Sequence, residues 1–160
     1  MPCVIREMNI KAKDLRIMLV NATPSESSKC FERIFSGINF FQQSAYQPLG
    51  ICYIGGTLYA NGFKDLLILD TNLSNMRLSE ALSFIVRYKP HVIGISCSSF
   101  SFWYARSLAI LVKEYFPDIL IVIGGVHADF YPTEILSHGC FDIVVRGEGE
   151  YIFLNIIREY

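Results

Sequence analysis

The sequence lacks a long hydrophobic run, an excess of charge of one sign and any closely spaced pair of cysteines. No apolar segment approaches the ~18 to 20 residues that cross a bilayer. The first residues, MPCVIREMNIKAKD, contain no hydrophobic region ahead of a small-residue cleavage site. A cytoplasmic protein without a membrane partner is therefore expected. Its net charge is −1 and its 14 Lys and Arg residues are scattered, so nucleic acid is not an expected partner.

The cysteines also exclude two classes of small domain. The chain has five of them, Cys3, Cys30, Cys52, Cys97 and Cys140, with wide spacing and no CxxC pair. A disulfide framework or a zinc knuckle would need closer pairs. We therefore expect reduced, mostly buried thiols and no metal site built from them.

Short apolar runs alternate with amphipathic segments along the chain. The expected strands are Leu15–Asn21, Asp65–Asp70, Val92–Ser96, Ile119–Ile123 and Asp142–Arg146. The expected helices are 48–62, the segment from Leu78 to Val86, the segment from Phe102 to Phe116 with Ser101 as its cap, a short helix beginning near Pro132, and Glu150–Tyr160. This alternation predicts an α/β fold, a flavodoxin-like, doubly wound, five-stranded parallel sheet of order 2-1-3-4-5. Residues 15–160 would form this domain, and residues 1–14 an amino-terminal extension.

The sequence lacks the residues that three other functions of this fold require. The first strand ends at Asn21, and the next four residues, ATPS, contain no glycine for a dinucleotide fingerprint. A phosphoacceptor domain needs an acidic residue there and a lysine after the fifth strand, where the chain has Arg146. The segment GISCS at 94–98 lacks the second glycine of a nucleophile elbow.

The strand at Ile119–Ile123 ends in Gly124 and Gly125, the clearest local signal in the sequence. Its unbroken apolar run is typical of a strand covered on both faces. Two residues without a Cβ at the carboxyl edge permit either a tight turn or the close approach of a ligand. Ser96 and Ser98 would add hydroxyls at the same edge, and Asp70 would either cap a loop or touch a ligand.

The succession PLG, LLILD, KPHVIGISCSS, PDILIVIGGVHA, PTEIL and FDIVVRGEGE resembles the amino-terminal cobalamin-binding domain of radical S-adenosylmethionine (radical SAM) enzymes. This resemblance implies a sheet that holds cobalamin over its carboxyl edge. Ser96, Ser98, Gly124 and Gly125 would line the slot for the nucleotide tail, and His127, Gly147 and Glu148 would border the corrin. Asp70 belongs to the same expected cofactor-binding set.

Two departures from related families shape this expectation. The loop after the first strand has no histidine, so it cannot supply the D-x-H-x-x-G ligand of methionine-synthase-type domains. His127 would form a hydrogen bond or ligate cobalt, whereas His91 and His138 are expected to be structural or solvated. No CxxxCxxC is present, so the iron–sulfur cluster and S-adenosylmethionine would belong to a radical SAM domain in cis or in trans. The whole enzyme would perform methyl transfer or a radical rearrangement.

Two other functions remain open at this point. A docking or dimerisation module of the same fold, a homodimer for example, would bind no cofactor and would fill the slot with its own side chains, such as Phe100 or Trp103. A flavin-binding electron carrier would use the hydroxyls of Thr23, Ser25, Ser27 and Ser28. The aromatic group 100–104 and the charged group Arg146, Glu148 and Glu150 can each be read as structural or as ligand-binding.

Overall fold

A computed structural model describes residues 14–22, 47–72 and 76–160. The strands are β1 (Ile17–Asn21), β2 (Leu66–Asp70), β3 (Val92–Ser96), β4 (Leu120–Gly124) and β5 (Ile143–Val144). The helices are α2 (Leu49–Ala60), α3 (Leu78–Tyr88), α4 (Phe102–Tyr115), α5 (Val126–Phe130), α6 (Pro132–Ser137) and α7 (Gly149–Glu159). All strand pairs are parallel and the order is β2-β1-β3-β4-β5, which confirms the predicted fold class.

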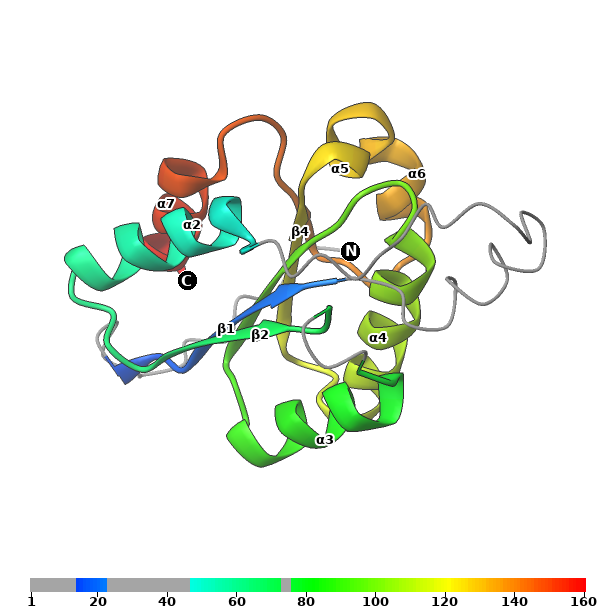
Figure 1. Cartoon of the computed structure of the whole chain (residues 1–160), viewed down its shortest axis with the longest axis horizontal. Helices are drawn as coiled ribbons and strands as arrows, with labels where there is room; N and C mark the ends of the chain where they lie inside the picture. The colour runs from blue at the N-terminus through cyan, green and yellow to red at the C-terminus, as the bar shows by residue number, and fades with distance from the viewer. Residues whose placement is uncertain (1–13, 23–46, 73–75) are drawn as a thin grey trace.

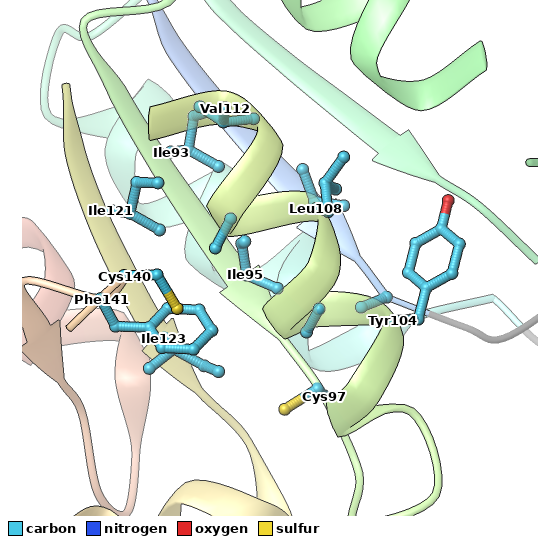
Figure 2. Packing of buried hydrophobic residues seen from close by; sticks show 14 of the residues in the cluster. Ile93, Ile95, Cys97, Tyr104, Leu108, Val112, Ile121, Ile123, Cys140 and Phe141 are labelled. Carbon is cyan, nitrogen blue, oxygen red and sulfur yellow. The ribbon is translucent and has the colours of Figure 1, made fainter. Parts of the chain in front are cut away.

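Helices cover both faces of the sheet (Figure 1). Helices α2 and α7 lie side by side on one face, and their apolar side chains pack with those of the sheet in one buried cluster. Helices α3 and α4 cover the other face over a second cluster. Figure 2 shows α4 lying across β3 and β4, where Leu108 and Val112 meet the isoleucines of both strands. Side chains alternate between the two clusters because successive residues of a strand face opposite sides.

The fifth strand is shorter than the predicted Asp142–Arg146. It has two residues, because the side chain of Asp142 takes the place of a ladder partner: its Oδ2 accepts the N–H of Ile121 at 2.7 Å. The N–H of Asp142 in turn donates to the carbonyl of Ile121 at 2.9 Å. Beyond the strand, the N–H of Val145 still donates to Ile123 O at 2.8 Å.

Two local predictions about helices were incomplete or wrong. Helix α5 was not expected, since its five residues follow the glycine pair too closely to show a helical period. Ser101 occupies the N-cap position of α4 but makes no side-chain cap bond. Its buried hydroxyl instead accepts the N–H of Ser98 at 2.9 Å, and so holds the turn between β3 and α4.

The glycine at position 55 allows α2 to pack closely on the sheet. A Cβ there would lie 3.2 Å from Ile68 and 3.3 Å from Leu66, so α2 lies close against the sheet. At Gly56 a Cβ would meet nothing within 4 Å, so packing does not require that second glycine.

Several expectations fall on residues outside the described ranges. They are the extension at 1–13, Cys3 and Cys30, and the hydroxyl-rich segment 23–46 on which the flavin alternative depends. Of the three cysteines that are described, Cys97 and Cys140 are buried and Cys52 is exposed. None of the helices in the described ranges is long and apolar enough to span a membrane.

Candidate functional site

The carboxyl ends of four strands lie in one row across the sheet. Asn21 pairs with Asp70 on one side and with Ser96 on the other, and Ser96 pairs with Gly124. The register therefore brings together residues more than one hundred positions apart in some cases, as expected from the sequence. In open parallel sheets this edge is where ligands bind.

A cavity of about 170 Å³ opens at this edge, between the sheet and the pair α2 and α7. It is lined by Leu19, Gly50, Ile51, Ile54, Gly94, Ile95, Ser96, Val122, Gly124, Gly125, Val145, Gly147, Glu148, Gly149, Glu150 and Phe153. Leu19, Val122 and Phe153 are nearly inaccessible to solvent, whereas Glu148 is exposed. The cavity is thus apolar inside and polar at its mouth.

A second, more open cavity of about 300 Å³ lies over the ends of β1 and β3. Its lining residues are Asn21, Ala22, Ser96, Cys97, Ser98, Phe100, Ser101, Gly125 and Val126. Ser96 and Gly125 line both cavities, so they form the boundary between them. Phe100 borders only this second cavity, and Trp103 borders neither, so neither ring fills the cavity beside α2 and α7.

The two glycines at the carboxyl end of β4, Gly124 and Gly125, serve different purposes. Gly125 has φ +94° and ψ −178°, a region essentially restricted to glycine, and a Cβ there would lie 2.6 Å from the carbonyl oxygen of Cys97. Its missing side chain therefore makes room for the β3–α4 turn. A Cβ on Gly124 would meet Val145 at 3.6 Å, an ordinary van der Waals distance, so the fold could accept a side chain at this position, which lines the first cavity.

The loop between β5 and α7 forms one wall of the first cavity. Gly147, with φ +73°, turns the chain there, and its N–H donates to Oδ1 of Asp129 at 2.7 Å. Asp129 belongs to α5, which directly follows the glycine pair. This bond therefore ties together two segments, after β4 and after β5, that each contribute residues to the same cavity.

His127 lies beside the site but lines neither cavity. Its ring packs against Phe102 and Tyr131, with centroid distances of 4.2 and 5.0 Å. Nδ1 lies 3.1 Å from Ser99 Oγ, and Nε2 is buried without a hydrogen-bond partner among the described residues. Burial lowers the pKa of His127 below its usual value.

The other histidines are placed away from both cavities. His91 precedes β3 at the opposite edge of the sheet, and its Nδ1 accepts the N–H of Arg16 at 2.9 Å. His138 follows α6, with Nε2 buried and its ring 5.5 Å from that of Phe102. In the described ranges, no three His, Cys, Asp or Glu side chains gather as a metal site.

Asp70 fastens a loop at the row of strand ends. Its Oδ1 accepts the side-chain N–H of Asn21 at 2.9 Å and the backbone N–H of Asn72 at 3.0 Å. Oδ2 is buried and has no partner in the part of the chain that the structure describes. Asp70 lines neither of the two cavities.

The apolar walls of the first cavity were missed by sequence reasoning. They come chiefly from Leu19 and Val122 in the sheet, Ile51 and Ile54 in α2, and Phe153 in α7. Apolar residues at helical spacing look the same in a sequence whether they pack on the sheet or border a cavity. The only feature of the sequence that indicated a cavity here was the glycine content of the segments around these apolar residues.

Comparison with known proteins gives a consistent result. A family model described as "B12 binding domain" matches residues 43–157. An anaerobic magnesium-protoporphyrin IX monomethyl ester cyclase of Rubrivivax gelatinosus is 30% identical over 113 residues, which are 70% of this chain and 20% of the cyclase. A cobalamin-dependent radical SAM methyltransferase, TokK of Streptomyces tokunonensis, is 34% identical over 70 residues, 43% of this chain and 10% of TokK.

Among solved structures, the cobalamin-dependent S-adenosylmethionine radical enzyme OxsB, with aqua-cobalamin and S-adenosylmethionine bound, superposes with a TM-score of 0.72. The match covers 92% of this chain and 19% of OxsB at 16% identity, and so shows a shared fold. The chain spans about one fifth of the length of this structure and of the cyclase.

Proposed function

Because this chain belongs to the B12 binding domain family, we propose that it binds cobalamin at the carboxyl edge of its sheet, with the nucleotide tail in the cavity beside α2 and α7. The single observation that carries this proposal is that cavity, which opens where four strand ends meet. Pockets for whole drug-sized ligands begin at roughly 300 Å³. A cavity of about 170 Å³ therefore suits one planar base, while the rest of a large cofactor would lie outside it.

The residues at the cavity fit such a tail. Gly124 leaves room for close approach to the backbone, and the hydroxyl of Ser96 stands at the boundary of the two cavities. The first turn of α7 begins at the mouth, where backbone N–H groups can meet a phosphate. Gly147 and Glu148 would border the tail's entry, and Ser98 and Gly125 would face the part of the cofactor that lies over the second cavity.

The proposal gives cobalt no imidazole from the described residues. His127 points Nδ1 at Ser99, and its Nε2 is buried. His91 lies at the opposite edge of the sheet, and His138 buries its Nε2. His127 would instead support the cofactor side of the site by holding the turn after β3.

A radical SAM catalytic domain, in cis or in trans, would be the partner. Cobalamin supplies a cobalt atom that can carry a methyl group for transfer. Several apolar side chains of α2, α5 and α7 are exposed, among them Leu49, Tyr53, Val126, Phe130 and Tyr151, and these would contact the corrin or the partner domain. The named relatives support methyl transfer or another radical reaction as the activity of the whole enzyme.

The test is binding of hydroxocobalamin to the purified chain. We expect corrin absorbance to co-elute with the protein at a ratio near one to one after gel filtration. A chain with an unchanged far-ultraviolet circular dichroism spectrum and no retained corrin would overturn the proposal. That result would favour the docking module, which a dimeric elution volume would support.

Asp129 is expected to strengthen this binding through the loop that it holds. Asp129→Ala removes the 2.7 Å bond to Gly147 N–H, so the β5–α7 loop must be ordered when the ligand binds. A bond of about 1 kcal/mol corresponds to roughly fivefold weaker hydroxocobalamin binding. Asp129→Asn keeps an acceptor oxygen and should bind like the wild type. Equal Kd values for the alanine and wild-type chains, measured by absorbance titration, would contradict this role.

A further inference from the structure

The two lateral edges of the sheet are built differently. At one of them β5 has only two residues, and the carboxylate of Asp142 bonds to β4 beside it. At the other, β2 has five residues, four of them leucine or isoleucine, and all five pair with β1 without a bulge. In the described ranges no strand pairs with the outer side of β2. Proteins usually protect such a strand with charge, proline, a bulge or shortness, because its open main-chain groups pair readily with another strand.

The open main-chain groups of β2 belong to Leu66 and Ile68. The carbonyl of Asp65 accepts the N–H of Ile17 in β1 at 2.9 Å, so the odd-numbered residues of β2 bond toward β1. Main-chain bonds alternate in direction along a strand, and the N–H and C=O of Leu66 and Ile68 therefore point outward. The side chain of Ile68 is 39% exposed, so the middle of this strand is accessible.

The sequence of β2 is complementary to itself. Lys64 lies three residues before Leu67, and Asp70 lies three residues after it. Two antiparallel copies centred on Leu67 would place each Leu66 opposite an Ile68. The same register would place each Lys64 opposite an Asp70, and opposite charges in these positions attract. The carboxylate of Asp70 is already bonded within its own chain, so this attraction acts between charges and requires no new hydrogen bond.

Helix α2, which lies over β2, has a side with small residues next to this edge. Ile54 and Asn61 face α7, because a Cβ on the first residue of α7 would lie 3.0 Å from Ile54 and Asn61 Oδ1 accepts a bond from α7 at 2.8 Å. Cys52, Gly56 and Tyr59 therefore lie on the opposite side of the helix, and all three are exposed. A Cβ on Gly56 would meet nothing within 4 Å, so this chain alone does not need a glycine that weakens the helix. Small residues let two helices approach closely.

We propose that two copies of this chain form a symmetric dimer across β2. The two sheets would join into one continuous sheet, and α2 of each copy would pack beside its counterpart. The partner is a second copy because one segment supplies both halves of the contact, as a two-fold axis requires. The residues of this contact, from Cys52 to Tyr59 on α2 and from Lys64 to Ile68, line neither cavity at Cys52, Gly56, Tyr59 or any position of the strand. The dimer would thus leave both cavities open.

The first test is the mass of the purified chain, measured by sedimentation equilibrium over a range of micromolar concentrations. We expect the mass of two chains. Gly56→Gln places a long side chain of good helix propensity on the contact side of α2, and both copies carry it, so the dimer Kd should rise at least about tenfold. Ala60→Gln is the matched control, because this exposed residue of the same helix faces away from the sheet. It should leave the Kd unchanged.

Single cysteines test the register. In the proposed dimer Leu67 lies opposite its own counterpart in a non-hydrogen-bonded pair, with a Cα–Cα distance of about 4.5 Å, which a disulfide can span. Leu67→Cys should therefore cross-link under mild oxidation, whereas Ile68→Cys should not, because Ile68 lies opposite Leu66. Random collision would favour the opposite result, since Ile68 is more exposed than Leu67. Both variants are made with Cys52→Ser, which removes an exposed thiol, and the Cys52→Ser chain alone gives the baseline on a non-reducing gel.

Three results would overturn the dimer. They are the mass of one chain at every concentration, equal Kd values for the two glutamine variants, and cross-linking of Ile68→Cys at least as complete as that of Leu67→Cys. A monomer whose Leu66 and Ile68 amides resist hydrogen exchange would show that another part of the same chain covers β2. Hydroxocobalamin retention is measured separately: a monomer that retains corrin overturns only the dimer, and a dimer without corrin overturns only the proposed function.

Discussion

Replacing Gly125 with alanine is expected to lower the free energy of unfolding by about 4 kcal/mol. The residue has φ +94° and ψ −178°, which costs any residue with a Cβ about 1 to 3 kcal/mol. The new Cβ would also lie 2.6 Å from Cys97 O and 3.0 Å from Cys97 N, both backbone atoms that cannot move aside alone. Overpacking of this kind adds about 1 to 3 kcal/mol. Urea unfolding followed by circular dichroism measures the change, and the melting temperature should fall by roughly 10 °C.

Two other glycines provide controls for this prediction. Gly139 has φ +69°, and a Cβ there would meet no atom within 4 Å, so Gly139→Ala should cost only about 1 kcal/mol of conformational strain. Gly124→Ala introduces a Cβ no closer than 3.6 Å to its neighbours and should leave stability almost unchanged. If all three alanine variants unfolded at the same urea concentration, close contact with the β3–α4 turn could not be what destabilises the Gly125 variant.

The Gly124 variant also has a functional use. Its Cβ would lie at ordinary contact distance from Val145, in the wall of the first cavity, so it should weaken hydroxocobalamin binding while the fold remains stable. Gly125→Ala would lose binding through loss of structure. The adjacent glycines would thereby separate a ligand requirement from a folding requirement.

Asp142→Ala is expected to destabilise the chain by about 2 kcal/mol. The substitution removes the acceptor for the N–H of Ile121, a fully buried residue of β4, and a buried donor without a partner costs about 1 to 3 kcal/mol. It also removes two bonds from Lys113 Nζ, at 2.9 and 2.8 Å, and these partly exposed charges add little. Thermal unfolding in dilute buffer would measure the change.

Asn at the same position separates the two contributions. Asp142→Asn keeps an oxygen for Ile121 N–H and loses only the negative charge, so it should cost less than half as much as the alanine variant. Equal losses for the two variants would mean that the ion pair with Lys113, and not the backbone bond, stabilises this edge. The effect matters for the site because β5 leads directly into Val145, Gly147 and Glu148.

The buried environment of Cys97 disfavours thiol chemistry at the carboxyl edge of the sheet. Burial raises the pKa of the Cys97 thiol to about 12, so the thiolate is scarce near neutral pH. The backbone of Cys97 has a structural role. Its carbonyl oxygen accepts the N–H of His127 at 3.4 Å, and its N–H donates to Gly124 O at 3.1 Å. Cys97 thus joins the ends of β3 and β4 through its main chain.

The sequence predicted the strands well because each is a short apolar run between polar or glycine-containing segments. It predicted the order of the strands from the α/β alternation, and the register then brought Asn21, Ser96 and Gly124 into one row as expected. It did not predict the short β5, because nothing in a linear pattern shows that the side chain of Asp142 would bond to Ile121. It also missed α5, whose five residues are too few for a periodic signal.

The sequence by itself determined the fold class and the family to which the chain belongs, and it indicated the edge at which we propose that the cofactor binds, because these follow from local runs and short motifs. Only the tertiary structure decided which residues border the cavity. Phe153 and Ile54 are ordinary apolar positions of helices until α2 and α7 pack over the carboxyl edge of the sheet. The tertiary structure also showed that Gly125 accommodates the backbone of Cys97 and that His127 contacts Ser99 and lines neither cavity, since such contacts join residues distant in the chain.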